Sequence, residues 1–277
     1  MWRYVELTGG RVQIPDARIT IYGAYHPIYD SLMGLPGMKC VFWTSSGGEM
    51  GFAPVEIEYL NRILRDPRVD RVIFGSKVLS DLFPRSCWAP YPLCTEGYEH
   101  SRQGEESPSK DNSSPYMTLF CPEGPKKNIT NQLMAAVLIQ RENGLILRTN
   151  IPVPPLFLSS GLKCVCYGWL PRQEYDNILS RSSLNLAVSW AETFHYQSAE
   201  AALMHVPSVG SQTIPWLQDR FKVRDSNNPE EIATVGIATM GSGLEQYENI
   251  KSYAISVNDI LADTIKNLLV IAKTIRS

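Results

Sequence analysis

The chain has little excess charge of either sign. Its 277 residues carry 26 Lys and Arg against 28 Asp and Glu, a formal net charge of -2, and charged residues make up 19% of the total. This balance gives no electrostatic basis for binding nucleic acid or an anionic membrane surface. The 44% of hydrophobic residues instead describe an ordinary globular protein that is long enough to bury one large core or two small ones.

Long hydrophobic runs and closely paired cysteines are also missing. No apolar run approaches the roughly 18 to 20 residues that a membrane-spanning helix needs, and no charged-then-apolar leader opens the chain, so we expect a cytoplasmic protein. None of the 6 cysteines belongs to a Cys-x-x-Cys pair. Cys164 and Cys166 alternate along a predicted strand, which predicts two small buried thiols on one face. Cys87 and Cys94 would be able to bridge only in an oxidising compartment.

What the chain does contain is a regular alternation of strand and helix patterns, which is typical of parallel sheets covered by helices. The predicted strands are residues 19–23, 40–43, 72–75, 117–121, 145–148, 164–168 and 184–188. The predicted helices are residues 54–64, 129–140, 173–180 and 256–275, with a further helix after residue 192. The sequence therefore predicts the α/β fold class.

A polar segment interrupts this alternation. Residues 101–109 read Ser-Arg-Gln-Gly-Glu-Glu-Ser-Pro-Ser and cannot bury enough apolar surface to order themselves. We therefore predict an N-terminal domain over 1–90, a linker or excursion over 91–116, and a second domain over 117–255. A C-terminal helix over 256–277 carries apolar residues on one side.

Two glutamates follow the predicted strand at 184–188. Glu192 lies at the carboxyl end of that strand and Glu200 on the next helix. In open parallel sheets ligands bind at this end of the strands, and a helix N-terminus there favours phosphate. A nucleotide diphosphate sugar offers hydroxyls for two carboxylates and phosphates for the helix. Taken alone, the pair also fits a solvated loop glutamate and a favourable acid in a first helical turn.

The residues around the pair favour the first interpretation. The segment contains Glu192, Phe194, Glu200 with Ala201 after it, and a Pro-x-Val strand start at 207–209. Together these residues resemble the signature of the retaining GT-B glycosyltransferases of family four. The resemblance implies two Rossmann-like, doubly wound domains. It also implies a metal-independent hexosyltransferase with no cofactor, whose donor substrate is a nucleotide diphosphate sugar. In such chains the last helix often crosses back to the first domain.

The same resemblance implies which residues meet the donor diphosphate. The loop after the strand at 117–121 would supply a basic residue, Lys127 first and Lys126 second. The usual Gly-Arg pair of this loop is replaced by Cys121 and Pro122. An ammonium group neutralises a departing diphosphate as a point charge. Without the resemblance, two lysines in a loop fit simple solvation.

The segment Gly168, Trp169, Leu170 and Pro171 resembles the Gly-x-(Val/Leu)-Pro turn that relatives place beside the nucleotide base. Glycine lets the backbone come close to a flat ring. The segment equally fits an ordinary strand-to-helix turn, and the two interpretations are compatible.

The resemblance further implies that Glu200 accepts hydrogen bonds from the ribose and that Glu192 contacts hydroxyls of the transferred sugar. The amides of Thr193, Phe194 and His195 would face the sugar or the diphosphate. His195 stands where relatives often have glycine. Its ring would either narrow the pocket and bond the donor, or pack as a satisfied buried histidine.

On the acceptor side the sequence departs from the family. Relatives have a further strand and a glycine-rich loop before a strand like that at 19–23, whereas this chain has only residues 1–17 in that space, so the N-terminal domain looks shortened. Relatives often carry a histidine after a strand like that at 41–43, whereas Ser45 and Ser46 lie in this stretch. A hydroxyl or a backbone amide of this stretch would have to substitute, or the activity would be weak, and His26 is a second candidate.

The resemblance therefore implies a retaining transferase that moves a hexose to an acceptor such as a glycan, lipid, protein or modified nucleic acid. Two alternatives stay open. The first alternative is a donor-binding accessory subunit that needs a partner chain, and the second is a GT-B sugar-nucleotide epimerase. A homo-oligomer fits any of the three.

Overall fold

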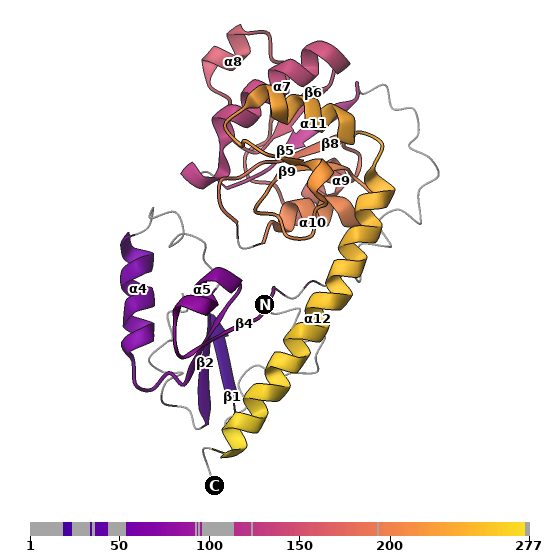
Figure 1. Cartoon of the computed structure of the whole chain (residues 1–277). Coiled ribbons are helices and arrows are strands. Elements are labelled where there is room, and N and C mark those ends of the chain that lie inside the picture. The colour runs from indigo at the N-terminus through magenta and orange to yellow at the C-terminus, as the bar shows by residue number, and fades with distance from the viewer. Residues whose placement is uncertain are drawn as a thin grey trace. The chain divides into compact units, whose positions relative to one another are not determined.

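The structure is a computed structural model that describes residues 19–23, 34, 37–43, 54–91, 93, 95, 114–122, 124–192 and 194–274. The chain divides into two compact units (Figure 1). Unit 1 comprises Met1–Cys94 and Ala254–Ser277, and unit 2 comprises Thr95–Tyr253. The long helix α12, Gly243–Thr274, contributes its first part to unit 2 and the remainder to unit 1.

Unit 1 contains a parallel four-stranded sheet of order β1-β2-β3-β4. Its elements are β1 Ile19–Gly23, β2 Met38–Trp43, α4 Pro54–Arg65, β3 Arg71–Phe74, α5 Lys77–Leu82 and β4 Ser86–Trp88. Apolar side chains of β2, β3 and α4 form its core, among them Trp43, Ile63 and Phe74, each at most 1% exposed. Helix α12 joins this unit through the Asn258 amide, which donates to the backbone oxygen of Leu93 at 3.1 Å.

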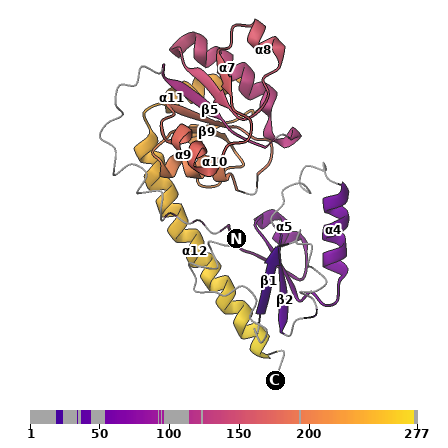
Figure 2. The ribbon, with the colours of Figure 1, turned by 180° about the vertical axis from the view of Figure 1, so that it is seen from behind.

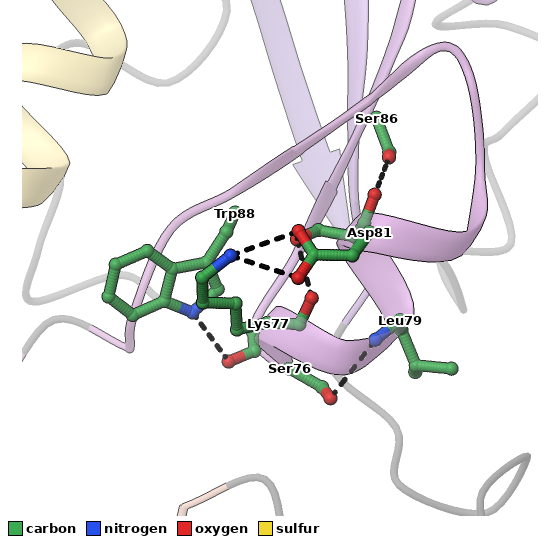
Figure 3. A network of polar contacts seen from close by, with 8 residues as sticks. Ser76, Lys77, Leu79, Asp81, Ser86 and Trp88 are labelled. Carbon is green, nitrogen blue, oxygen red and sulfur yellow. Dashed lines mark hydrogen bonds and ion pairs between the residues drawn. The ribbon is translucent and has the colours of Figure 1, made fainter.

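Local polar contacts set the start of α5 in unit 1 (Figure 3). The Ser76 side chain caps the helix by accepting a hydrogen bond from the Leu79 amide at 3.4 Å. Lys77 pairs with Asp81 one turn later at 2.9 Å. The Trp88 indole donates to the Gly75 carbonyl at 3.3 Å and so ties β4 to the turn before the helix.

Unit 2 contains a parallel six-stranded sheet of order β10-β9-β8-β5-β6-β7. The strands are β5 Tyr116–Leu119, β6 Ile146–Thr149, β7 Cys164–Cys166, β8 Leu184–Ala187, β9 Ser208–Ser211 and β10 Lys222–Val223. The helices are η1 Pro125–Lys127, α7 Ile129–Asn143, α8 Pro155–Ser159, α9 Arg172–Ser180, α10 Tyr196–Leu203, η2 Asp219–Phe221 and α11 Pro229–Thr239. Counted from the β7 edge, this is the Rossmann order 3-2-1-4-5-6, whose direction reverses between β5 and β8.

Helices cover both faces of the sheet in unit 2. Helices α7, α8 and α11 lie on one face, and α9 and α10 on the other (Figures 1 and 2). Alternation along β5 explains the two cores: Met117 and Leu119 pack with α7, whereas Tyr116 and Phe120 pack with α9. Both faces of β5 and β8 are buried, which is why these strands consist of nearly continuous apolar residues.

A buried polar chain crosses the sheet toward helix α10. Asn185, fully buried in β8, accepts from the Gln197 amide and donates to the Ser208 hydroxyl at 2.9 Å. The backbone N–H of Ser208 donates to the Gln246 side chain of α12 at 2.8 Å. The first turn of α10 is thereby connected to strands β8 and β9 and to the start of α12.

The structure corrects some predictions. The last helix begins at Gly243 rather than 256, and α5, α8, α11, β4 and β10 have no counterpart among the predictions. Cys164 is half-buried and Cys166 exposed, so the prediction of two buried thiols is wrong. Both lie on β7 at the edge of the sheet, where neighbours cover less of each side chain. Cys94 lies outside the described residues.

Within the described part of the chain, no helix is long and apolar enough to cross a membrane.

Candidate functional site

The site starts in the loop that follows β5, which is held at both ends. At its start, the Asn150 side chain accepts from the Cys121 amide at 3.0 Å and donates to the Cys121 carbonyl at 2.9 Å. At its end, the Gln132 amide donates to the Lys127 carbonyl at 2.8 Å. Asn128 then enters α7 in the left-handed conformation, with φ 51. The loop therefore presents Lys127 at a defined position beside the carboxyl end of β5.

Lys127 and Glu192 form an ion pair. Their side chains are 12% and 6% exposed, although the two residues lie 65 positions apart. Gln132 links the two loops, because its carbonyl also accepts from the Val188 amide at the end of β8 at 2.9 Å. The structure thus brings the two predicted catalytic residues together where the strand order reverses, the usual ligand position in such sheets.

His195 lies beside this pair and begins helix α10. Its Nδ1 accepts from the Ser198 amide at 3.2 Å, so the imidazole acts as the N-cap. Burial, the largest cause, lowers the pKa of His195 to about 4, and the charge of Lys127 adds to this while Glu192 opposes it. The ring is therefore neutral near pH 7, with its proton on Nε2. The prediction of a packed, satisfied histidine fits this arrangement.

Glu200 lies farther along α10 and is held from α9. Arg172 Nη1 contacts its Oε1 at 2.7 Å, and the Tyr175 hydroxyl donates to its Oε2 at 2.9 Å. Only 15% of the Glu200 side chain is exposed. Burial and then the charge of Glu200 raise the pKa of Tyr175, so its hydroxyl stays protonated and acts as a donor.

The predicted base-side turn precedes α9 directly. Gly168 has φ 68, the left-handed region that favours glycine, and a Cβ atom there would have no atom within 4 Å beyond its two chain neighbours. Trp169 is 88% exposed, whereas Leu170 packs against the cluster of Tyr116 and Phe120. Conformation, rather than close packing, is thus what requires a glycine at this turn.

Of the remaining predicted residues, the structure describes Lys126 and Phe194. The Lys126 carbonyl accepts from the Trp190 amide at 2.9 Å, which joins the β5 and β8 loops a second time. Phe194 is buried, with ring contacts to Tyr196 and Tyr253, so its side chain serves packing. His26, Ser45, Ser46 and Thr193 lie outside the described residues.

Gln132, Arg172 and Tyr175 were not predicted from the sequence. Arg172 and Asp176 have the four-residue spacing of a helical ion pair, which predicts that contact but not the one to Glu200. Gln132 carries no local signal, because its two partners lie in different loops. In the residues that the structure describes, no three His, Cys, Asp or Glu side chains gather in a way that would hold a metal ion.

The sequence matches no protein-family model and no curated protein. Solved structures do resemble it. An α,α-trehalose-phosphate synthase (UDP-forming) from Burkholderia vietnamiensis matches 96% of this chain and 75% of its own, with a TM-score of 0.68 and 10% identity. The E. coli trehalose-6-phosphate synthase bound to UDP-2-fluoro glucose matches 92% of this chain and 74% of its own, with a TM-score of 0.66 and 11% identity.

A third similar structure is a TarM variant from S. aureus in complex with fondaparinux, α-GlcNAc-glycerol and UDP. It matches 95% of this chain and 57% of its own, with a TM-score of 0.65 and 13% identity. The fold is that of the GT-B glycosyltransferases. The predicted fold class is therefore confirmed, and at these identities the likeness establishes the fold.

Proposed function

We propose that this protein is a retaining glycosyltransferase that moves a hexose from a nucleotide diphosphate sugar to an acceptor hydroxyl. The observation that carries the proposal is the buried contact between Lys127 and Glu192 at the carboxyl ends of β5 and β8. It supports a donor site because the cation of Lys127 is able to bind a diphosphate, and the carboxylate of Glu192 is able to accept hydrogen bonds from sugar hydroxyls. The family resemblance of the sequence supports the retaining stereochemistry.

Each charged residue has a separate role in this proposal. The Lys127 ammonium has three donors, so it is able to keep Glu192 and still donate to a phosphate oxygen. Glu192 accepts from hydroxyls of the sugar, and its contact with Lys127 fixes the distance between the sugar and phosphate positions. Preorganised charge of this kind lowers the barrier to departure of the diphosphate, and is usually the largest catalytic term.

Three further groups would complete the donor site. Helix α10 has its N-cap, His195, beside the pair, and its N-terminal dipole favours the diphosphate. Glu200 accepts from the ribose hydroxyls, and the turn at Gly168 lies beside the base. The departing phosphate would take the proton of the acceptor, so the mechanism asks for no separate base and no cofactor.

Uridine nucleotides are the first donors to test, because two of the similar structures are described with UDP or a UDP-sugar. UDP-glucose, GDP-mannose and ADP-glucose are compared by thermal shift and by calorimetry. A donor that binds stabilises the folded protein by about 3 kcal/mol at a concentration of 100 times its Kd. If none of the three binds, the proposed donor site is wrong.

Turnover is then measured as release of the free nucleotide, with and without an acceptor mixture of glycans, lipid extract and peptides. Glu192→Gln should abolish release, whereas Glu174→Gln, an exposed acid on α9, should leave it unchanged. Binding without release or transfer would contradict the transferase and support an accessory subunit. An epimerised donor in the absence of acceptor would contradict it in favour of an epimerase.

A further inference from the structure

Helix α9 holds the carboxylate of Glu200 at both oxygens. Arg172 binds Oε1 at 2.7 Å and the Tyr175 hydroxyl binds Oε2 at 2.9 Å. Because these donors come from two directions, rotation of the carboxylate would break at least one charge-assisted hydrogen bond. The position of both oxygens is therefore set by α9 as well as by the backbone of α10.

The two donors differ in how firmly they are placed. Tyr175 packs against Phe120, with ring centroids 5.4 Å apart, inside an apolar cluster of unit 2. The Arg172 side chain is 54% exposed and is shared, because its Nε also donates to Asp176 at 2.9 Å. Tyr175 thus acts as the rigid contact, and Arg172 supplies the positive charge.

Arg172 also has a particular place in the chain. It is the first residue of α9 and follows Pro171, the last residue of the turn that begins at Gly168. That turn is the segment that would lie beside the nucleotide base. A contact from Arg172 to Glu200 therefore joins the base side of the proposed donor site to its ribose side.

We propose that Arg172 and Tyr175 are positioning residues for the donor nucleotide, which act by holding the Glu200 carboxylate where it meets the ribose hydroxyls. The inference rests on the proposed function, in which Glu200 binds the ribose. Because the ribose is held equally in the ground state and the transition state, losing this hold raises KM for the donor and leaves kcat nearly unchanged.

The test is a double-mutant cycle on nucleotide affinity. The Kd values of UDP, GDP and ADP are measured by calorimetry for the wild-type chain and for Tyr175→Phe, Arg172→Gln and Glu200→Ala. They are also measured for two double variants, in which Tyr175→Phe or Arg172→Gln is combined with Glu200→Ala. For the nucleotide that binds best, Tyr175→Phe and Arg172→Gln should each weaken binding about three- to tenfold. Neither should have a further effect once Glu200 is Ala.

Two controls separate positioning from stability. Tyr116→Phe removes another buried tyrosine hydroxyl of the same cluster, which donates to the Ile178 carbonyl at 2.8 Å. Asp176→Asn removes the negative charge that pairs with Arg172 Nε and leaves both contacts of Glu200 in place. Both controls should bind the nucleotide as the wild type does, even where they lower the melting temperature.

Each other outcome contradicts the inference. If Glu200→Ala weakens binding but the α9 variants do not, the positioning role is wrong while the proposed donor site stands. If the α9 variants weaken nucleotide binding equally with Glu200 and with Ala at position 200, Arg172 and Tyr175 contact the nucleotide directly. If Tyr116→Phe weakens nucleotide binding as much as Tyr175→Phe does, the effect comes from general packing of the cluster. If no nucleotide binds, or Glu200→Ala has no effect, the proposed ribose site fails and the inference with it.

Discussion

The Lys127 ammonium lies against the Glu192 carboxylate, and only 12% and 6% of the two side chains are exposed. A buried ion pair contributes little net stability compared with apolar residues, but the loss of one partner leaves an uncompensated charge. Single and double variants of the pair therefore separate its effect on the free energy of unfolding from its effect on turnover.

We expect Lys127→Met and Glu192→Gln each to lower the free energy of unfolding by about 3 kcal/mol, because each variant leaves one buried charge without its partner. The double variant should recover most of that loss in urea denaturation, yet show no turnover. Additive losses in the double variant would mean that the two side chains do not act on each other.

Gln132→Met should destabilise unit 2 by about 2 kcal/mol, because the partly buried Lys127 carbonyl and the buried Val188 amide lose the partner that Gln132 provides. It should also weaken nucleotide binding, since both loops of the site lose their connection. Gln140 on the same helix provides a matched control, with two backbone contacts of 2.8 Å at a partly exposed position. Gln140→Met should cost less and leave the affinity unchanged, and equal effects on affinity would contradict the bridging role of Gln132.

His195 predicts a dependence of stability on pH. The imidazole takes up a proton near pH 6.5 in the unfolded chain, but only near pH 4 in the folded protein. Burial is the largest cause of this lowered pKa. The charges of Lys127 and Lys126 lower the pKa further, whereas the charge of Glu192 raises it. The folded state therefore loses up to about 3 kcal/mol as the pH falls from 6.5 to 4. His195→Asn retains a capping side chain and cannot titrate. Chemical denaturation at several pH values should show a smaller loss for this variant, and parallel curves would contradict the shifted pKa.

Gly168 and Gly243 should differ in their tolerance of alanine. At Gly243 a Cβ atom would lie 1.9 Å from the backbone oxygen of His205, which no side-chain movement relieves, whereas at Gly168 it meets nothing within 4 Å. Gly168→Ala should therefore cost only about 1 kcal/mol of left-handed strain. Gly243→Ala should cost about 3 kcal/mol, because α12 has to shift to relieve the overlap. Denaturation curves that place Gly168→Ala as the more harmful change would contradict this ranking.

The central strands of unit 2 could be predicted because their signal is local. Strands β5 and β8 are buried on both faces, so apolar runs such as 184–188 are needed wherever the fold places them. Strand β4 could not be predicted: Ser-Cys-Trp has no periodicity, and its position depends on pairing with β3 and on the contact from Trp88 to Gly75. The start of α12 was missed because Gly243 lowers the local helix preference, whereas the structure places this glycine against the His205 backbone.

By itself, the sequence determined the residue types of the candidate site and their order along the chain. Glu192 and Glu200 lie in one short segment with a recognisable pattern, and Lys127 was selected by its place after the predicted strand at 117–121. Only the tertiary structure decided which of them meet. The ion pair of Lys127 with Glu192 joins positions 65 apart, and that of Arg172 with Glu200 joins positions 28 apart. The physical reason is that strand order and helix packing depend on burial summed over a whole unit, and no single segment carries that information.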